Sequence, residues 1–281
     1  MDNIKQVGIV IKPHAPRVEE MLVELIQYFK SRGIECLLED VAASKIQHTE
    51  GVPRESVPGQ VDLVIVMGGD GTLLSVAHLC AQKNVPVMGV NLGKLGFLTE
   101  VPLDEMYVTL DAFLEGNINI ISARQMLEAH TKGGTFFCLN DFVINKGALA
   151  RMIQCAIWID GKTIATSKAD GLIISTPTGS TAYSLSAGGP IIQPNIPAFI
   201  IAPICPHTLS FRPMVISAES TLKIELVTGG EEVWFTLDGQ RGGRMEVNDV
   251  VEVRRSRYVL SLISSPKRNY FDLLQEKLGW G

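Results

Sequence analysis

The sequence predicts an α/β N-terminal domain with an open, mostly parallel sheet, followed by an all-β C-terminal domain and a C-terminal helix that returns to the first domain. Up to about residue 117, apolar strand-like runs alternate with helical patterns. After that point Val, Ile and Thr dominate short runs between glycine turns, and helical spacing returns only at Tyr270. A chain of 281 residues, of which 46% are hydrophobic, is long enough for two packed cores.

The first domain, residues 1–117, is expected to begin with a buried parallel strand, because Val7–Ile11 is a short, apolar and β-branched run. A helix should follow over Val18–Arg32, where apolar residues recur on one face and Gly33 marks the end. The next strands are expected at Ile34–Leu38, Val61–Met67 and Val85–Val90. The polar stretch Asp40–Gln60 contains two prolines and is predicted to be a mobile loop.

The second domain, residues 118–265, is expected to consist of short strands joined by tight turns. Turn signals recur at Lys132-Gly133-Gly134, Asp160-Gly161 and Asp238-Gly239. The second of these is interpreted as a hairpin turn between Cys155–Ile159 and Thr163–Ala165. Residues 266–281 carry apolar residues at helical spacing, so this segment is expected to pack back on the first domain.

Charge and cysteine content limit the function. The net charge of −5 argues against a nucleic-acid partner held by a broad basic face. The five cysteines are scattered, with no metal-finger or redox spacing, and are interpreted as buried thiols in a reducing compartment. The first residues do not resemble a signal peptide, and no apolar run is long enough to cross a bilayer. We therefore expect a cytoplasmic protein that does not bind membranes.

The run Gly68-Gly69-Asp70-Gly71-Thr72 directly follows an apolar strand and precedes a helix that opens near Thr72. In an open α/β sheet this position lies at the carboxyl edge, where ligands bind. Glycines let a phosphate approach the backbone, and amides at a helix start favour an anion. The run is equally compatible with an ordinary tight turn in which Asp70 or Thr72 caps the helix.

Two other phosphate-binding motifs are excluded. The dinucleotide fingerprint needs a third glycine where this chain has Leu74. A Walker-type loop needs a glycine where Ala156 stands, five residues before Gly161. An ordinary NAD-dependent dehydrogenase and a P-loop nucleotidase are therefore not predicted.

The run Asp170–Pro190 is more informative. An apolar strand leads into a dense cluster of hydroxyls, small residues and glycines, too polar for a core. It offers hydrogen-bond donors for ribose and phosphate, and the Tyr183 ring could pack against a base. The alternative is a Ser/Thr-rich surface loop without a ligand.

Taken in order along the chain, these runs resemble the NAD kinase family. The resemblance rests on Gly68–Thr72, Asn140-Asp141, Asp170–Pro190, Pro203–Ser210 and Leu237-Asp238-Gly239-Gln240, and it covers the chain from about Val7 to Trp280. It implies an α/β domain and a β domain with a site between them. It also implies transfer of a phosphoryl group from ATP or polyphosphate to the 2′-hydroxyl of the adenosine ribose of NAD, giving NADP. The alternatives are a lipid kinase of the related glycine-aspartate class and a non-enzymatic dinucleotide-binding protein.

The resemblance also assigns roles to residues. Asp70 matches the family's proton acceptor. The substrate-binding positions are Gly71, Asn140, Asp141, Arg151, Lys168, Asp170, Thr181, Ala182, Tyr183, Ser184, Leu185, Ser186 and Gln240. Gly93 and Phe97 would border the donor. His207 lies in a run that resembles the family, and for this residue a role in bracing the backbone is favoured over a catalytic role. The family usually has Asn-Glu where this chain has Asn140-Asp141, so the carboxylate here is one methylene shorter.

We expect no permanent metal site in the protein, because too few carboxylates cluster in the sequence. A divalent ion, Mg²⁺, would arrive with the phosphoryl donor. The resemblance further implies a homo-oligomer, a dimer or a tetramer, with Asp170 near a subunit junction.

Overall fold

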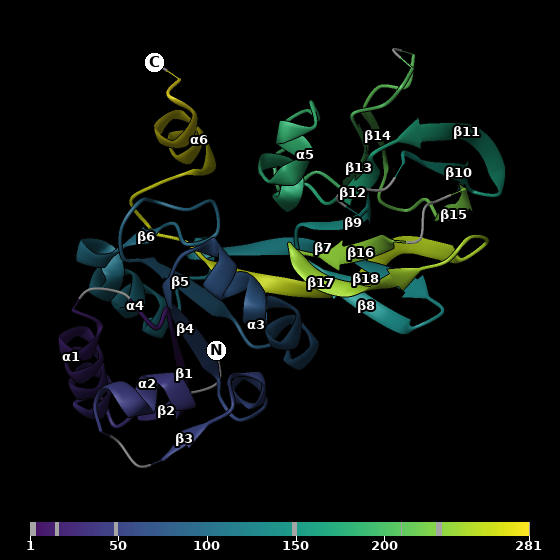
Figure 1. Ribbon diagram of the computed structural model, residues 1–281. Helices are drawn as coiled ribbons and strands as arrows, with labels where there is room; N and C mark the ends of the chain where they lie inside the picture. The colour runs from purple at the N-terminus through teal and green to yellow at the C-terminus, as the bar shows by residue number, and fades with distance from the viewer. Residues whose placement is uncertain are drawn as a thin grey trace. The chain divides into compact units, whose positions relative to one another are not determined.

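The computed structural model describes residues 4–14, 17–47, 50–147, 151–208, 210–228 and 232–280 (Figure 1). The chain forms two compact units. Unit 1 comprises residues 1–123 and 259–281, and unit 2 comprises residues 124–258. The chain thus rejoins unit 1 at Val259, before the predicted start of the C-terminal segment at residue 266, because the last residues of a long strand already pair with the unit 1 sheet.

Unit 1 is built on a parallel sheet with the strand order β3-β2-β1-β4-β5. Two short pieces pair parallel with β5, namely β6 and the end of β18. The strands are β1 (Gln6–Ile11), β2 (Glu35–Glu39), β3 (Gly51–Val52), β4 (Leu63–Gly68), β5 (Val87–Asn91), β6 (Val101–Pro102) and β18 (Val250–Ile263). The predicted parallel α/β layer is confirmed.

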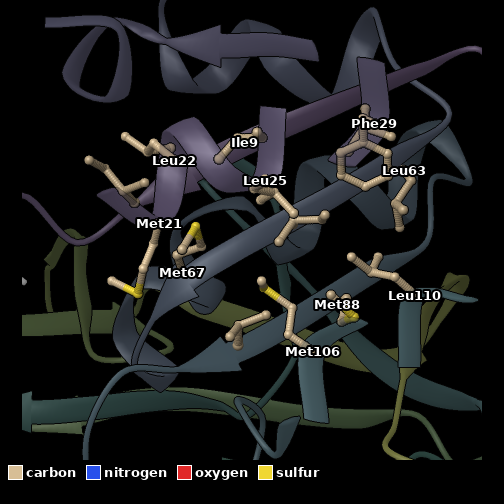
Figure 2. Close-up of a cluster of buried hydrophobic side chains, with 14 of the residues drawn as sticks. Ile9, Met21, Leu22, Leu25, Phe29, Leu63, Met67, Met88, Met106 and Leu110 are labelled. Atoms are coloured by element: carbon tan, nitrogen blue, oxygen red, sulfur yellow. The ribbon is translucent and has the colours of Figure 1, made fainter. Parts of the chain in front are cut away.

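The helices of unit 1 cover both faces of this sheet. They are α1 (Val18–Lys30), α2 (Asp40–Lys45), α3 (Asp70–Lys83), α4 (Met106–Leu114) and α6 (Tyr270–Leu278), with short 3₁₀ helices η1 (Arg54–Gly59), η2 (Leu103–Glu105) and η3 (Ile118–Ile120). Figure 2 shows Leu25 of α1 and Met106 of α4 in one cluster with Met67 and Met88 of the sheet, all of them buried. Replacing Leu25 by alanine would cost about 2–5 kcal/mol of folding free energy.

The stretch Asp40–Gln60 is not the mobile loop that its polarity and prolines predict. It contains α2, β3 and η1, with residues 48–49 outside the described part. The Val57 side chain of η1 is fully buried on β1, where any Cβ at Gly8 would overlap it. The prediction failed because one buried valine and a glycine on the facing strand are enough to fix a polar segment.

A buried ion pair ties this stretch to the ends of β1 and β2. The Arg54 guanidinium donates to both carboxylate oxygens of Glu39, at 2.6 and 3.1 Å. Glu39, 1% exposed, also accepts from the Ile11 N–H at 2.6 Å, while Arg54 donates to Ser75 of α3 at 3.2 Å. Losing Arg54 would leave a buried carboxylate without its counter-charge, at a cost of about 3–5 kcal/mol.

Unit 2 is a sandwich of two antiparallel sheets. One has the order β14-β13-β12-β9-β16-β17, and the other contains β11-β10-β15-β18 together with β7 and β8. The strands are β7 (Ile121–Thr131), β8 (Gly134–Cys138), β9 (Asp141–Lys146), β10 (Ile153–Ile159), β11 (Lys162–Ala169), β12 (Gly171–Ser175), β13 (Ala198–Ile204), β14 (Met214–Ser217), β15 (Leu222–Thr228), β16 (Val233–Leu237) and β17 (Gln240–Met245). The hairpin predicted at Asp160-Gly161 joins β10 to β11.

The six-stranded sheet of unit 2 is covered on both faces at β12. Leu172 and Ile174 point into the sandwich core, whereas Ile173 packs on the opposite face with Ile192 and Ile200. The chain after β12 forms η4 (Thr178–Thr181) and α5 (Tyr183–Ser186), and Figure 1 shows α5 beside β12 and β13. No helix in the described part of the chain is long and apolar enough to span a membrane.

Candidate active site

Asp70 stands at the carboxyl end of the fully buried strand β4, as the first residue of α3. The N-cap residue of this helix is Gly69, in an extended conformation, and no side chain caps the helix. The interpretation of Asp70 or Thr72 as a helix cap is therefore wrong. Gly71, the second residue of the helix, is exposed.

The Asp70 carboxylate binds the backbone of the segment 97–99. One oxygen accepts from the N–H of Phe97 at 2.9 Å. The other accepts from the N–H groups of Leu98 and Thr99 at 3.1 and 2.9 Å, and from the Thr99 hydroxyl at 2.9 Å. A Cβ at Gly96 would overlap this carboxylate, so glycine is required there. Asp70 thus anchors the loop after β5, in addition to any part in catalysis.

The loop after β5 is held at further points within unit 1. The Asn91 side chain accepts from the Gly93 N–H at 2.6 Å and donates to the Lys94 carbonyl. Lys277 of α6 donates to the Leu95 carbonyl at 2.7 Å, and its Nζ lies 5.5 Å from the centroid of the Phe97 ring. Asn91 and Gly93 also line a cavity of about 520 Å³ in unit 1. The predicted donor-side residues therefore belong to one fixed loop.

In unit 2, Asn140 and Asp141 lie where β9 begins, 9% and 3% exposed. Asn140 Oδ1 is buried without a hydrogen-bond partner. Burial of a polar atom without a partner is costly, which makes this position a candidate contact for a ligand that donates a hydrogen bond. Burial raises the pKa of Asp141 to about 7, and the nearby carboxylate of Asp238 adds to this shift.

The segment after β12 is more buried than its composition predicts. Thr176, Thr178 and Ser180 are 0%, 6% and 0% exposed. The hydroxyl of Thr176 donates to the Leu139 carbonyl at 2.5 Å, and that of Ser180 to the Pro177 carbonyl at 2.6 Å. The expectation that a run so rich in hydroxyls is too polar for a core is therefore wrong, because these hydroxyls donate hydrogen bonds to backbone carbonyls, one nearby in the sequence and one on the segment before β9.

Farther along this segment the side chains are freer. Ser184 is fully buried and its hydroxyl has no partner. Tyr183 is 43% exposed and Ser186 is exposed, which leaves both available to a ligand. Thr181, Ala182 and Leu185 are partly buried, and the Thr181 hydroxyl bonds the Thr178 carbonyl at 3.3 Å.

The charged and amide residues predicted for the site are dispersed over unit 2. Asp170 forms an ion pair with Lys146 at 3.2 Å. Arg151, Lys168 and Gln240 are exposed. The backbone N–H of His207 bonds the Lys168 carbonyl at 2.9 Å, and residue 209 of the same run lies outside the described part.

Comparison with known proteins identifies the family. The model of the ATP-NAD kinase N-terminal domain matches residues 7–118, and that of the ATP-NAD kinase C-terminal domain matches residues 139–265. The chain belongs to the NAD kinase family.

Relatives and solved structures agree with this assignment. The chain is 45% identical to an NAD kinase of Syntrophotalea carbinolica and 46% identical to one of Geotalea daltonii, with 99% of each chain covered. A crystal structure of yeast NADH kinase complexed with NADH matches with a TM-score of 0.91 and 28% identity over 100% of this chain and 89% of that one. An Archaeoglobus fulgidus NAD kinase in complex with ATP shares the fold, with a TM-score of 0.77 and 23% identity over 98% of this chain and 100% of that one.

Two residues stand out in this NAD kinase fold that sequence reasoning did not assign to the site. Asp238, which the sequence places in a turn and in a motif of the resemblance but which received no role of its own, binds the backbone around Asn140. Gly179 lies so close to the Asn140 carbonyl that any Cβ there would overlap it. The sequence shows Asp238 in an Asp-Gly turn and Gly179 among hydroxyl residues. It does not show that both lie against the backbone at Asn140, because that residue is far from each of them along the chain.

The side chains that hold metal ions in proteins are mostly those of His, Cys, Asp and Glu. No group of three or more His, Cys, Asp or Glu side chains among the described residues is placed to hold a metal ion. Both oxygens of Asp70 are occupied by backbone donors.

Proposed function

We propose that this chain catalyses the transfer of the terminal phosphoryl group of ATP, or of polyphosphate, to the 2′-hydroxyl of the adenosine ribose of NAD, giving NADP. One observation within the site carries the proposal. Asn140 presents a buried amide oxygen without a protein partner, and Asp141 presents a buried carboxylate next to it, on a backbone held by Asp238. The adenosine of NAD supplies the hydroxyl and amino donors that such acceptors need.

Family membership supports the dinucleotide as substrate. The relatives that match over nearly the whole chain are named NAD kinases, and the yeast structure with the same fold binds NADH. Ser184, with its unpartnered buried hydroxyl, and the half-exposed ring of Tyr183 would complete the contacts to the substrate. A lipid acceptor would need an apolar pocket instead, and the groups without partners here are polar.

Asp70 would accept the proton of the attacking hydroxyl. Proton transfer requires the carboxylate to come within hydrogen-bond distance of that hydroxyl. Gly71 is exposed and carries no side chain that could block such an approach. The hydrogen bonds to residues 97–99 fix the orientation of the carboxylate, so its rotation need not be frozen when the substrate binds.

The divalent ion would enter as part of the donor substrate, as Mg·ATP, because phosphoryl transfer needs charge neutralisation at the phosphates and coordination through them suffices. A cytoplasmic location would agree with the five cysteines, all of which are free. We expect a homo-oligomer, a dimer or a tetramer, with Asp170 near the junction. A sedimentation experiment that finds a fully active monomer would contradict this assembly.

The activity is tested with the purified protein, NAD, Mg²⁺ and either ATP or polyphosphate. NADP is then measured with a dehydrogenase that accepts only NADP. The proposal expects NADP to accumulate in proportion to enzyme. Phosphorylation of a lipid, with no NADP from either donor, would contradict it.

A further inference from the structure

Asp238 occupies the first position of the two-residue turn between β16 and β17, with φ of 50°, and Gly239 follows with φ of 76°. Both values suit the tight turn that twists with a hairpin. From this turn the Asp238 carboxylate accepts three backbone N–H groups, those of Leu139 at 2.9 Å, Asn140 at 2.7 Å and Asp141 at 3.0 Å. A hairpin turn does not require its first residue to accept hydrogen bonds from three successive backbone N–H groups of another segment.

The carbonyl groups of the same three residues are also bonded. Thr176 donates its hydroxyl to the Leu139 carbonyl at 2.5 Å and its N–H to the Asn140 carbonyl at 2.8 Å. The Asp238 N–H donates to the Asp141 carbonyl at 3.0 Å. Every backbone group of residues 139–141 therefore has a partner. Beside this bonded backbone, Asn140 Oδ1 is buried without a hydrogen-bond partner, and the neighbouring Asp141 side chain is buried.

We propose that Asp238 is a positioning residue, which holds residues 139–141 so that the Asn140 amide and the Asp141 carboxylate point at the substrate ribose or base. This inference rests on the proposed function. It adds a residue that does not touch the substrate but controls both groups that do.

The carboxylate of Asp238 also sets the electrostatics of Asp141. Burial raises the pKa of Asp238 to about 6 despite its three N–H donors, and its charge adds to the raised pKa of Asp141. Among the described residues, Cys138 also faces this pair, and its thiol has a pKa well above its ordinary value because it is buried, so it stays neutral. A substrate that donates hydrogen bonds to Asp141 favours its ionised form, so substrate binding should weaken as the pH falls through about 7.

The substitution Asp238→Asn distinguishes a role of Asp238 in positioning residues 139–141 from a role in forming the turn alone. Its amide keeps one oxygen for the backbone donors, but it places an NH₂ group against at least one N–H and removes the charge beside Asp141. Asp160 provides a matched control within unit 2. It opens the other Asp-Gly turn, with φ of 50°, and its carboxylate accepts from the Thr221 N–H at 2.9 Å and the Ser220 hydroxyl at 3.0 Å.

The experiment compares wild type, Asp238→Asn and Asp160→Asn in NADP formation from NAD and Mg·ATP between pH 5 and 9, with NAD binding by calorimetry. For Asp238→Asn we expect KM and Kd for NAD to rise about 10- to 100-fold, the usual effect of losing a hydrogen bond to a charged group. We expect kcat to change by less than about threefold, since the reacting groups are untouched. The acid limb of kcat/KM should move to lower pH, because the charge that raises the pKa of Asp141 is gone. Asp160→Asn should match wild type in all of these.

Equal KM and equal pH profiles in Asp238→Asn and wild type would overturn the inference, as would a fall in kcat alone. If Asp238→Asn does not fold, amide hydrogen exchange in the wild type replaces it. The protection factors of residues 139–141 should then fall together as the pH drops below about 6, where Asp238 takes up a proton. Protection that does not change there overturns the inference. A wild type that binds no NAD and forms no NADP would instead refute the proposed function.

Discussion

The Asp70 carboxylate accepts the backbone N–H of Phe97 at 2.9 Å, which joins the start of α3 to the loop after β5. With the bonds to Leu98 and Thr99, this carboxylate organises a loop 27 to 29 positions away in the chain. A residue proposed to move a proton therefore also has a structural task. Substitutions of Asp70 must be judged by stability and by rate together.

Asp70→Asn should reduce kcat by about 10²–10⁴-fold, because asparagine cannot accept a proton. It should also lower the melting temperature, since its NH₂ group cannot accept from the N–H groups that Asp70 serves, at a cost of about 1–3 kcal/mol. Steady-state kinetics and thermal unfolding measure the two effects.

Thr99→Val is the control for Asp70→Asn. It removes one donor to Asp70 and keeps the carboxylate, so it should lower stability while kcat stays within a few fold of wild type. A wild-type kcat in Asp70→Asn would show that Asp70 is only structural, and that the base lies elsewhere.

Asp141→Ala should raise the KM for NAD and leave kcat largely intact, because its carboxylate would contact the adenosine equally in the ground state and the transition state. Losing a hydrogen bond to a charged group typically costs about 1.5–3 kcal/mol. Kinetics at saturating ATP with varied NAD provide the measurement. An unchanged KM with a collapsed kcat would assign Asp141 to the chemical step.

Asp141→Asn should stabilise the protein at alkaline pH. The pKa of Asp141 is about 7 in the folded state, against about 3.9 in an unfolded chain. The contribution of Asp141 to the free energy of unfolding is therefore fully favourable below about pH 3.9, and it is lost as the pH rises to about 7. At pH 8 the buried carboxylate is ionised beside Asp238, and asparagine removes that cost, which is a few kcal/mol at most.

Thermal unfolding from pH 5 to pH 8 tests this linkage. The difference between the higher melting temperature of Asp141→Asn and that of the wild type should decrease steadily as the pH falls. Glu252→Gln, at an exposed position on β18, is the control and should show no such trend. A melting-temperature difference that grows toward pH 5 would contradict the linkage.

The fold was largely predictable because its strongest signals are local. The apolar run at Val7–Ile11 and the one-sided helix from Val18 appear as β1 and α1 almost residue for residue. The segment Asp40–Gln60 was not predictable in the same way. Its order depends on Val57 and on the Glu39–Arg54 pair, whose partners come from other elements.

For the candidate site, the sequence motifs around Asp70 and Asn140 indicate positions directly, and the roles proposed for these residues stay predictions. The roles of individual side chains were harder to foresee. Thr176 and Ser180 look like ligand groups in the sequence but donate hydrogen bonds to backbone carbonyls, whereas Asp238 looks like a turn residue but holds three amides. The composition of a segment shows which polar side chains are present. Only the tertiary structure shows which of these side chains already have hydrogen-bond partners within the protein.

Phosphorylation of NAD at the 2′-hydroxyl can be measured directly by following the phosphoryl group from ATP to the product. The purified protein is incubated with NAD, Mg²⁺ and ATP labelled in the terminal phosphate, and the dinucleotide product is isolated. We expect each molecule of dinucleotide product to carry one labelled phosphate and to be reduced by an NADP-specific dehydrogenase. ADP should form in an amount equal to that of the product. Label released only as inorganic phosphate, or carried by a dinucleotide that this dehydrogenase does not reduce, would contradict this expectation.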